Sequence, residues 1–267
     1  MGPLLRPKEK LTILQAGLTH NNKELVKQML AMKVSVNSPD KNGHTPLYIA
    51  LHEYLSSKDK LVRDLLEAGA DIYFKPRSST IMTPLEKAIS LQDHTLVSIL
   101  LQHQPIRDNP RAPKGVYLHA AARAAPSKRM LSTLILSGAS VTELDSNGDT
   151  PLSVFLKSIA DLPHWAANTR RAGNRICGTV WYLWNNKVDI NLRNKSGKAI
   201  TSYLSALRMY DGDNPARKRI AEELRLGLEI VPAQGADGET ELKTLRFRHG
   251  LMGLGNFHGG SKPPIGL

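Results

Sequence analysis

One thiol and one nearby imidazole are the side chains of this sequence that could carry out nucleophilic chemistry. Cys177 is the only cysteine, and His164 lies a short distance before it in the chain. A base beside a thiol favours the thiolate, which is the nucleophilic form. Free cysteine is also among the residue types most often buried. We therefore favour the interpretation that Cys177 is a small, half-buried residue beside Trp181, with the reactive thiol as the alternative.

Other catalytic signatures are incomplete or missing. The run Ser196-Gly197-Lys198-Ala199 contains the Gly-Lys pair of a phosphate-binding loop, but it lacks the upstream glycine and the hydroxyl that would hold magnesium. The His-Glu-x-x-His pattern of zinc helices and the Gly-x-Ser-x-Gly pattern of hydrolases do not occur. We therefore predict that the protein is not an enzyme and holds neither a metal nor another cofactor.

The charge balance of the chain is strongly basic. Lys and Arg number 36 against 24 for Asp and Glu, which gives a formal net charge of +12. Such a surface attracts acidic protein, nucleic acid or anionic membrane, although a simple excess of solvated Lys and Arg is an equal interpretation. One cysteine excludes an intrachain disulfide and fits a reducing compartment. Without an apolar run long enough for a signal peptide or a membrane span, we expect a cytoplasmic protein, a nuclear one, or both.

A repeated unit headed by Thr-Pro-Leu predicts the elements that position these charges. Threonine is a good N-cap and proline a good first helical residue, so each head begins a helix. A second apolar helix follows each head, and Gly69 and Gly138 can end that helix in the second and fourth units. The period is about 33 residues. Its copies stand at Thr45-Pro46-Leu47, Thr83-Pro84-Leu85 and Thr150-Pro151-Leu152, with a degenerate copy at Tyr117-Leu118-His119.

This head and period resemble the ankyrin repeat family over about residues 11–230. The resemblance implies an all-α, ankyrin-type solenoid of about six helix-turn-helix repeats with short projecting hairpin-like turns. Residues 1–10 are then an N-terminal extension, and residues 231–267 a C-terminal segment with a flexible tail. The family usually places histidine after the leucine of the head, and only the fourth unit does so, with His119.

The fifth unit is longer than its neighbours because of an insertion at about residues 161–176. The insertion and the helix after it are rich in aromatic residues, which form either a stacking platform for a partner or part of the core; we favour the core. These aromatic residues are Trp165, Trp181, Tyr182 and Trp184.

The resemblance implies that a partner binds along the turns that project between units. Four of the five predicted turns carry basic residues, whereas the fourth carries Glu143, Asp145 and Asp149 and is predicted to interrupt the strip as an acidic turn. Solvated charge without a binding role is the alternative interpretation. The predicted partner-binding residues are Lys41, Lys75, Arg77, Arg107, Arg111, Lys114, Arg193, Lys195 and Lys198.

Three functions fit this sequence. The first is a non-enzymatic protein-interaction module, a scaffold or regulatory adaptor that binds a partner with an acidic surface along the basic turns. The second is a nuclear transcription coregulator of the ankyrin type. No DNA-reading helix is visible, so nucleic acid would be bound only by weak phosphate contacts. The third is the recruiting part of an enzyme complex, with residues 161–176 completing a site.

Overall fold

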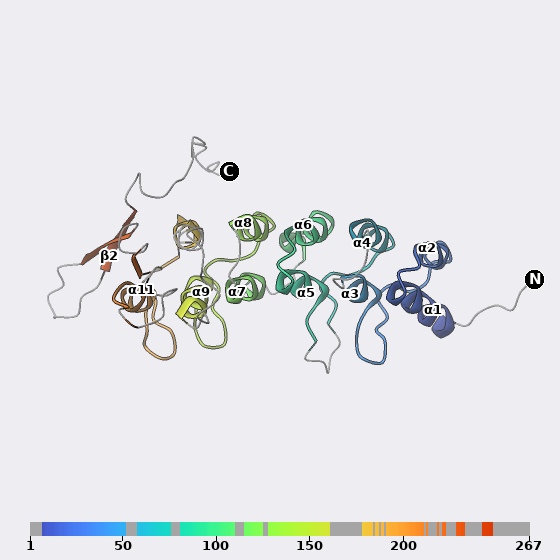
Figure 1. The fold of residues 1–267 in the computed structure, drawn as a ribbon, viewed down its shortest axis with the longest axis horizontal. Helices are drawn as coiled ribbons and strands as arrows, with labels where there is room; N and C mark the ends of the chain where they lie inside the picture. The colour runs from blue at the N-terminus through green and yellow to red at the C-terminus, as the bar shows by residue number, and fades with distance from the viewer. Residues whose placement is uncertain are drawn as a thin grey trace, which may run out of the picture.

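The chain forms an elongated stack of helix pairs (Figure 1). The inserted segment 161–176, Cys177, Trp184 and the C-terminal tail lie outside the described residues, so the predictions for His164 and Trp165 are not tested. The computed structural model describes residues 7–51, 58–75, 81–109, 115–124, 128–160, 178–183, 185–186, 188–189, 191–210, 212, 218, 221–222, 228–232 and 242–247.

The helices form two layers. The first helices of successive units contact one another in chain order and form the inner layer, while the second helices contact one another and form the outer layer (Figure 1). Residues 178–183, which are also helical, belong to the fifth unit. The inner layer comprises α1 (Pro7–Thr19), α3 (Pro46–Ala50), α5 (Pro84–Ser90), α7 (Val116–Arg123), α9 (Pro151–Ala160) and α11 (Ile200–Arg208). The outer layer comprises α2 (Lys23–Ala31), α4 (Lys58–Glu67), α6 (His94–His103) and α8 (Lys128–Leu136).

The Thr-Pro-Leu heads begin inner helices, as predicted. The hydroxyl oxygens of Thr45 and Thr83 accept hydrogen bonds from backbone N–H groups three residues later, at 3.2 and 3.1 Å. At Thr83 the cap is reciprocal, because its own N–H donates to Glu86 Oε2 at 2.7 Å. Glu86 stands where the family usually has histidine, and here it completes a capping box that satisfies two otherwise unpaired N–H groups.

One continuous apolar core runs along the stack between the two layers. The leucine of each head is fully buried, and the apolar residues of the outer helices pack against it. Because each unit buries its apolar face only against its neighbours, the core grows by one layer with each repeat. The head leucines are Leu47, Leu85, Leu118 and Leu152.

Two side-chain amides link neighbouring units through the loop that follows α4. Asn37 donates to the carbonyl of Gly69 at 2.9 Å and accepts from the N–H of Asp71 at 2.7 Å. From the other side, Gln104 donates to the carbonyl of Ala70 at 2.7 Å. The same loop therefore has its backbone groups satisfied by both neighbouring units, which fixes the spacing of the stack at this point.

Two differences from the sequence-based assignment lie at the ends of the stack. Helix α1 begins at Pro7, so it includes residues that we assigned to the N-terminal extension. After the repeats, β1 (Leu228–Pro232) and β2 (Leu242–Phe247) pair as an antiparallel ribbon that the sequence analysis did not predict. The repeats themselves are all-α, and none of the described helices is long and apolar enough to cross a membrane.

The capping box of α5 gives a test of how the repeats begin. We expect Thr83→Ala to lower the free energy of unfolding by about 1 kcal/mol, because the N–H group of Glu86 loses its acceptor. Urea denaturation followed by circular dichroism measures this change. Ser90→Ala in the same helix is the control, since among the described residues its exposed hydroxyl donates only to the carbonyl of Lys87. Equal midpoints for the two variants would contradict the expectation.

Candidate functional site

Three projecting turns, 40–44, 145–149 and 194–198, share one hydrogen-bond pattern. In each, Oδ1 of the first residue accepts from backbone N–H groups two and four residues later, at distances of 2.8 to 3.0 Å. The N–H of the first residue donates to the carbonyl of the fifth. The fourth residue is a glycine with φ between 73° and 85°, a conformation that disfavours other residues. The sequence signal is Asp or Asn followed three residues later by Gly, which the sequence analysis did not use.

The turns 145–149 and 194–198 are joined to each other. The N–H of Lys195 donates to the carbonyl of Asn147 at 3.0 Å. Asn194 Nδ2 donates to Asp149 Oδ1 at 2.8 Å, so the residue that shapes one turn also holds the other. A Cβ atom on Gly148 would lie 3.2 Å from the backbone nitrogen of Lys195, which shows how closely the two turns approach. Figure 1 shows both turns projecting beyond the inner layer, on the side away from the outer layer.

Asp149 is the buried centre of this region, with a side chain only 1% exposed. Its Oδ2 pairs with Lys157 Nζ from α9, and its backbone carbonyl lies 2.8 Å from His119 Nε2 of α7. Lys157 also lies over the ring of Tyr203 from α11, 5.4 Å from its centroid. Burial acts to lower the pKa of Lys157, but hydrogen bonds to Asp149 and Tyr203 and their charges outweigh it, so the pKa is raised.

Asp145, which shapes the turn 145–149, is also largely buried. Its side chain is 11% exposed and lies 3.5 Å from Nη2 of Arg123, at the end of α7. Burial acts to raise the pKa of Asp145, but the N–H groups of Asp149 and Asn147 and the nearby charges of His119 and Arg123 outweigh it, so the pKa is lowered. The carboxylate is therefore ionised and neutralised within the protein.

These contacts correct the prediction that the turn 145–149 and the residues before it form an acidic interruption of the basic strip. Of the three acidic residues that predicted it, only Glu143 is exposed. Asp145 and Asp149 face inward, where Arg123 and Lys157 pair with them. The sequence could not distinguish a solvent-exposed acidic turn from one whose carboxylates are buried.

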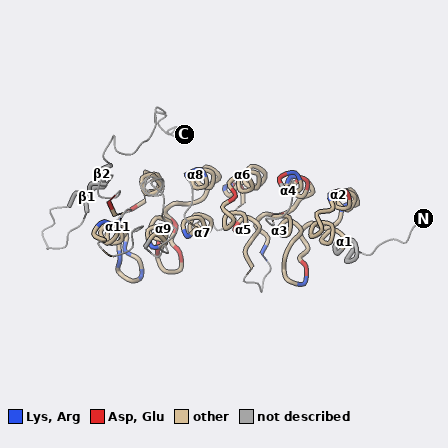
Figure 2. The backbone as a smooth tube through the Cα atoms, viewed as in Figure 1, with Lys and Arg blue, Asp and Glu red and all other residues tan. Residues whose placement is uncertain are grey.

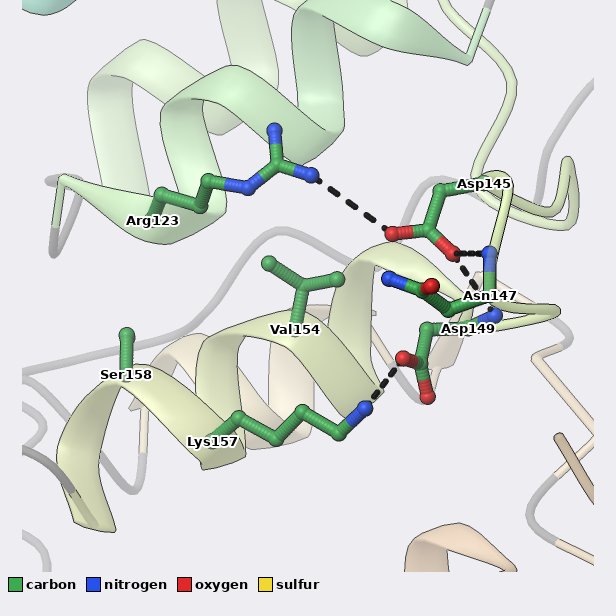
Figure 3. A pocket seen from close by; sticks show the side chains of 7 residues that line it. All are labelled: Arg123, Asp145, Asn147, Asp149, Val154, Lys157 and Ser158. Atoms are coloured by element: carbon green, nitrogen blue, oxygen red, sulfur yellow. Dashed lines mark hydrogen bonds and ion pairs between the residues drawn. The ribbon is translucent and has the colours of Figure 1, made fainter. Parts of the chain in front are cut away.

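A pocket of about 400 Å³ lies between this turn and the inner helices α7 and α9 (Figure 3). Figure 3 shows the side chains of Arg123 and Lys157 on either side of Val154, both directed toward the turn. The side chain of Arg123 is 59% exposed and that of Lys157 is 36% exposed. The pocket is lined by Arg123, Asp145, Asn147, Asp149, Val154, Lys157 and Ser158.

The described residues of the predicted partner-binding set are all exposed, but they lie at several places (Figure 2). Three of them, Arg193, Lys195 and Lys198, lie together on or beside the turn 194–198. Arg107 lies instead beside the end of α8, where its N–H donates to the carbonyl of Ser137 at 2.8 Å. The exposed residues of the set are Lys41, Lys75, Arg107, Arg193, Lys195 and Lys198, whereas Arg77, Arg111 and Lys114 lie outside the described residues.

The sequence did not single out the pocket residues Arg123 and Lys157, because neither lies in a projecting turn. Both lie on inner helices, where a single charged residue in an amphipathic pattern is ordinarily a solvated surface residue. Lys157 lies two helical turns after Asp149 in the sequence, and only the fold of α9 brings its Nζ back to that carboxylate. The spacing of Asp149 and Lys157 in the sequence is compatible with this contact, but the spacing alone does not predict it.

Stacked helix pairs with projecting turns define the class of helical repeat solenoids. No family model and no curated protein matches this sequence. Among solved structures, the ankyrin repeat protein EF0377 is similar at 19% identity and a TM-score of 0.59, over 80% of this chain and 97% of that one. An ankyrin repeat domain from Acinetobacter baumannii AYE is similar at 19% identity and a TM-score of 0.57, over 79% and 95%. The chain has the ankyrin-repeat fold, as its sequence predicts.

A third similar chain belongs to a complex. It comes from the structure of Bd0816, a predatory endopeptidase from Bdellovibrio bacteriovorus, with the immunity protein Bd3460. The similarity is 17% in identity with a TM-score of 0.52, over 80% of this chain and 96% of that one. At this level of identity, each of these likenesses establishes the fold and no more.

The lowered pKa of Asp145 predicts a pH dependence of stability. A carboxyl group whose pKa falls on folding stabilises the protein above its unfolded pKa, near 3.8, and loses that contribution as the pH falls through the folded pKa. We expect Asp145→Asn to lower the free energy of unfolding at neutral pH by about 1 kcal/mol, because neutral hydrogen bonds replace charged ones. Urea unfolding from pH 7 to pH 3 measures it.

The difference between Asp145→Asn and the unaltered protein should shrink as the pH falls below the usual range of the carboxyl group. Asp59→Asn is the control, since it removes an exposed carboxylate from α4. A difference that stays constant across the pH range would show that the charge of Asp145 does not stabilise the turn.

Proposed function

We propose that the protein is a non-enzymatic adaptor that binds an acidic segment of a partner protein along its basic projecting turns. The observation that carries this proposal is the set of three exposed cations at the turn 194–198. Their attraction for an acidic segment is not opposed by the neighbouring turn, since Asp145 and Asp149 are neutralised inside the protein. The described residues Lys41, Lys75 and Arg107 extend the same chemistry along the chain.

The turn 194–198 presents these cations on a fixed backbone. Asn194 accepts from two N–H groups of its own turn and donates to Asp149 and to the hydroxyl of Tyr203, at 2.8 and 3.1 Å. Arg193 Nη1 donates to the carbonyl of Gly197 at 3.0 Å. A fixed backbone lowers the conformational cost of binding, because less of it must be ordered when the partner arrives.

The same hydrogen bonds favour a charged peptide over a phosphate bound by the backbone. A phosphate-binding loop needs free N–H groups that point at the anion. In the turn 194–198 the N–H groups of Ser196 and Lys198 are held by Asn194, and that of Lys195 is held by Asn147. Recognition at this turn therefore depends on the side chains, whose long-range attraction suits an acidic protein surface.

One of the similar structures also supports a protein as the partner, since it is a complex between an endopeptidase and an immunity protein. Neither the nuclear role nor the recruiting role in an enzyme complex is favoured by a particular contact among the described residues. The adaptor function is therefore the one that we carry forward.

A charge-reversal experiment tests this function. The probe is a fluorescent peptide of alternating Glu and Gly, amidated at its C-terminus, and fluorescence anisotropy measures its binding. We expect the triple variant Arg193→Glu, Lys195→Glu and Lys198→Glu to bind it at least about tenfold more weakly, since attraction becomes repulsion. Binding to the unaltered protein should weaken as the salt concentration rises.

The matched control reverses three exposed cations of the outer layer with the variant Lys27→Glu, Lys60→Glu and Arg63→Glu. Both triple variants change the net charge equally, so any difference between them reports the position of the charge. If the two variants bind the peptide with the same affinity, the basic turn is not the binding surface.

A further inference from the structure

We infer that the pocket between α7, α9 and the turn 145–149 binds a carboxylate side chain of the partner's acidic segment, with Arg123 as the residue that selects it. This inference rests on the proposed function and adds to it a specific anchor point. It concerns residues on the inner helices, which the strip of basic turns does not include.

The charges of the pocket are arranged by depth. Its two carboxylates are buried, with side chains 11% and 1% exposed, whereas its two cations are 59% and 36% exposed. An approaching ligand therefore meets the cations first, although the formal charges of the four groups cancel. Figure 3 shows Asp145 and Asp149 at the turn and the side chains of Arg123 and Lys157 extending toward them.

Arg123 has spare donors for a ligand. Among the described residues its guanidinium contacts Asp145 through Nη2, at 3.5 Å, which is a loose ion pair rather than a close two-point contact. A guanidinium has five N–H groups in a planar fork that matches a carboxylate. The remaining N–H groups of Arg123 can form that two-point contact with an incoming carboxylate.

Of the other residues that line the pocket, two are held in position by hydrogen bonds and one can donate a hydrogen bond to a ligand. Lys157 is held by Asp149, and the hydroxyl of Ser158 donates to the carbonyl of Phe155 at 2.7 Å, so both have defined positions. Asn147 is exposed, and its side-chain amide can donate to a ligand across the pocket from Val154. Figure 3 places the Asn147 side chain between those of Arg123 and Lys157.

Charge favours a carboxylate over a phosphate in this pocket. A phosphate group carries nearly two negative charges at neutral pH and would lie close to two ionised carboxylates. The single negative charge of Glu or Asp meets less of that repulsion, and the exposed side of Arg123 balances it. The pocket volume of about 400 Å³ exceeds what one such side chain needs and leaves space for its hydration.

The pocket also lies beside the basic turn. Asn147, which lines the pocket, accepts a hydrogen bond from the backbone of Lys195 in the turn 194–198. An acidic segment that crosses the turns can therefore place one carboxylate against Arg123 and its neighbours near the cations of the next turn. Two sites joined by one short segment bind more tightly than either alone.

The test uses the full chain and the same amidated Glu-Gly peptide, whose only carboxylates are side chains. We expect Arg123→Gln to weaken its binding about tenfold, because a charged two-point hydrogen bond is lost. The matched control is Arg129→Gln, which removes an equal charge from an exposed position on α8 in the outer layer. Binding of the control should stay within about twofold of the unaltered protein, because only weak long-range attraction changes.

Two further measurements keep the inference falsifiable. Arg123→Lys retains the charge beside Asp145 but loses the planar fork, so we expect affinity between those of the unaltered protein and Arg123→Gln. Thermal melting of each variant shows whether it is folded at the temperature of the binding assay. If Arg123→Gln unfolds, Arg123→Lys carries the test.

The outcomes separate this inference from the proposed function. Equal binding by Arg123→Gln and Arg129→Gln overturns the pocket, whatever the basic turn does. Loss of binding in Arg123→Gln, with no loss in the triple variant of the turn 194–198, supports the pocket and overturns the basic turn. A phosphoserine peptide that binds more tightly than the Glu peptide and depends on Arg123 overturns the choice of a carboxylate.

Discussion

The pairing of the buried Asp149 carboxylate is the interaction on which the arrangement of the last two units depends. A buried charge is costly unless it is paired and hydrogen-bonded, and this one draws its partners from elements far apart in the sequence. Lys157 comes from α9 and Asn194 from the next turn, while Tyr203 of α11 holds both of these partners. Because these partners belong to α9, α11 and the turn between them, one buried carboxylate links the three elements.

That register also determines what the surface presents. Because Asp145 and Asp149 are turned inward, the charged groups that the two turns leave at the surface are the cations that pair with these carboxylates and the cations of the turn 194–198. The cations exposed at these turns thus reflect how the buried carboxylates are satisfied, and not only the overall excess of Lys and Arg. This is why the net charge of the chain alone could not locate a binding site.

The sequence predicted the fold well because the information is local. Thr83, Pro84 and Glu86 set the start of α5 through contacts within one helical turn, and such contacts are visible in a sequence. The links made by Asn37 and Gln104 were not predicted, because each depends on a backbone group of another unit. The pocket was not predicted for the same reason, because Arg123 and Lys157 come together only when α7, α9 and a turn meet. The ribbon of β1 and β2 also pairs segments that are apart in the chain.

The residue after the head leucine makes different contacts in different units, and in the fourth unit it links that unit to the next. In the second unit Tyr48 stacks on His44 at 4.6 Å between ring centroids, and in the third unit Glu86 completes a capping box, so both serve their own unit. Only His119 reaches out of its unit, to the carbonyl of Asp149 in the turn that follows. That contact brings the turn 145–149 against α7, where Asp145 meets Arg123. In a stack where each unit touches only its neighbours, contacts between units form between adjacent ones. Of the histidine-position residues that the structure describes, His119 is the one that ties such a pair together.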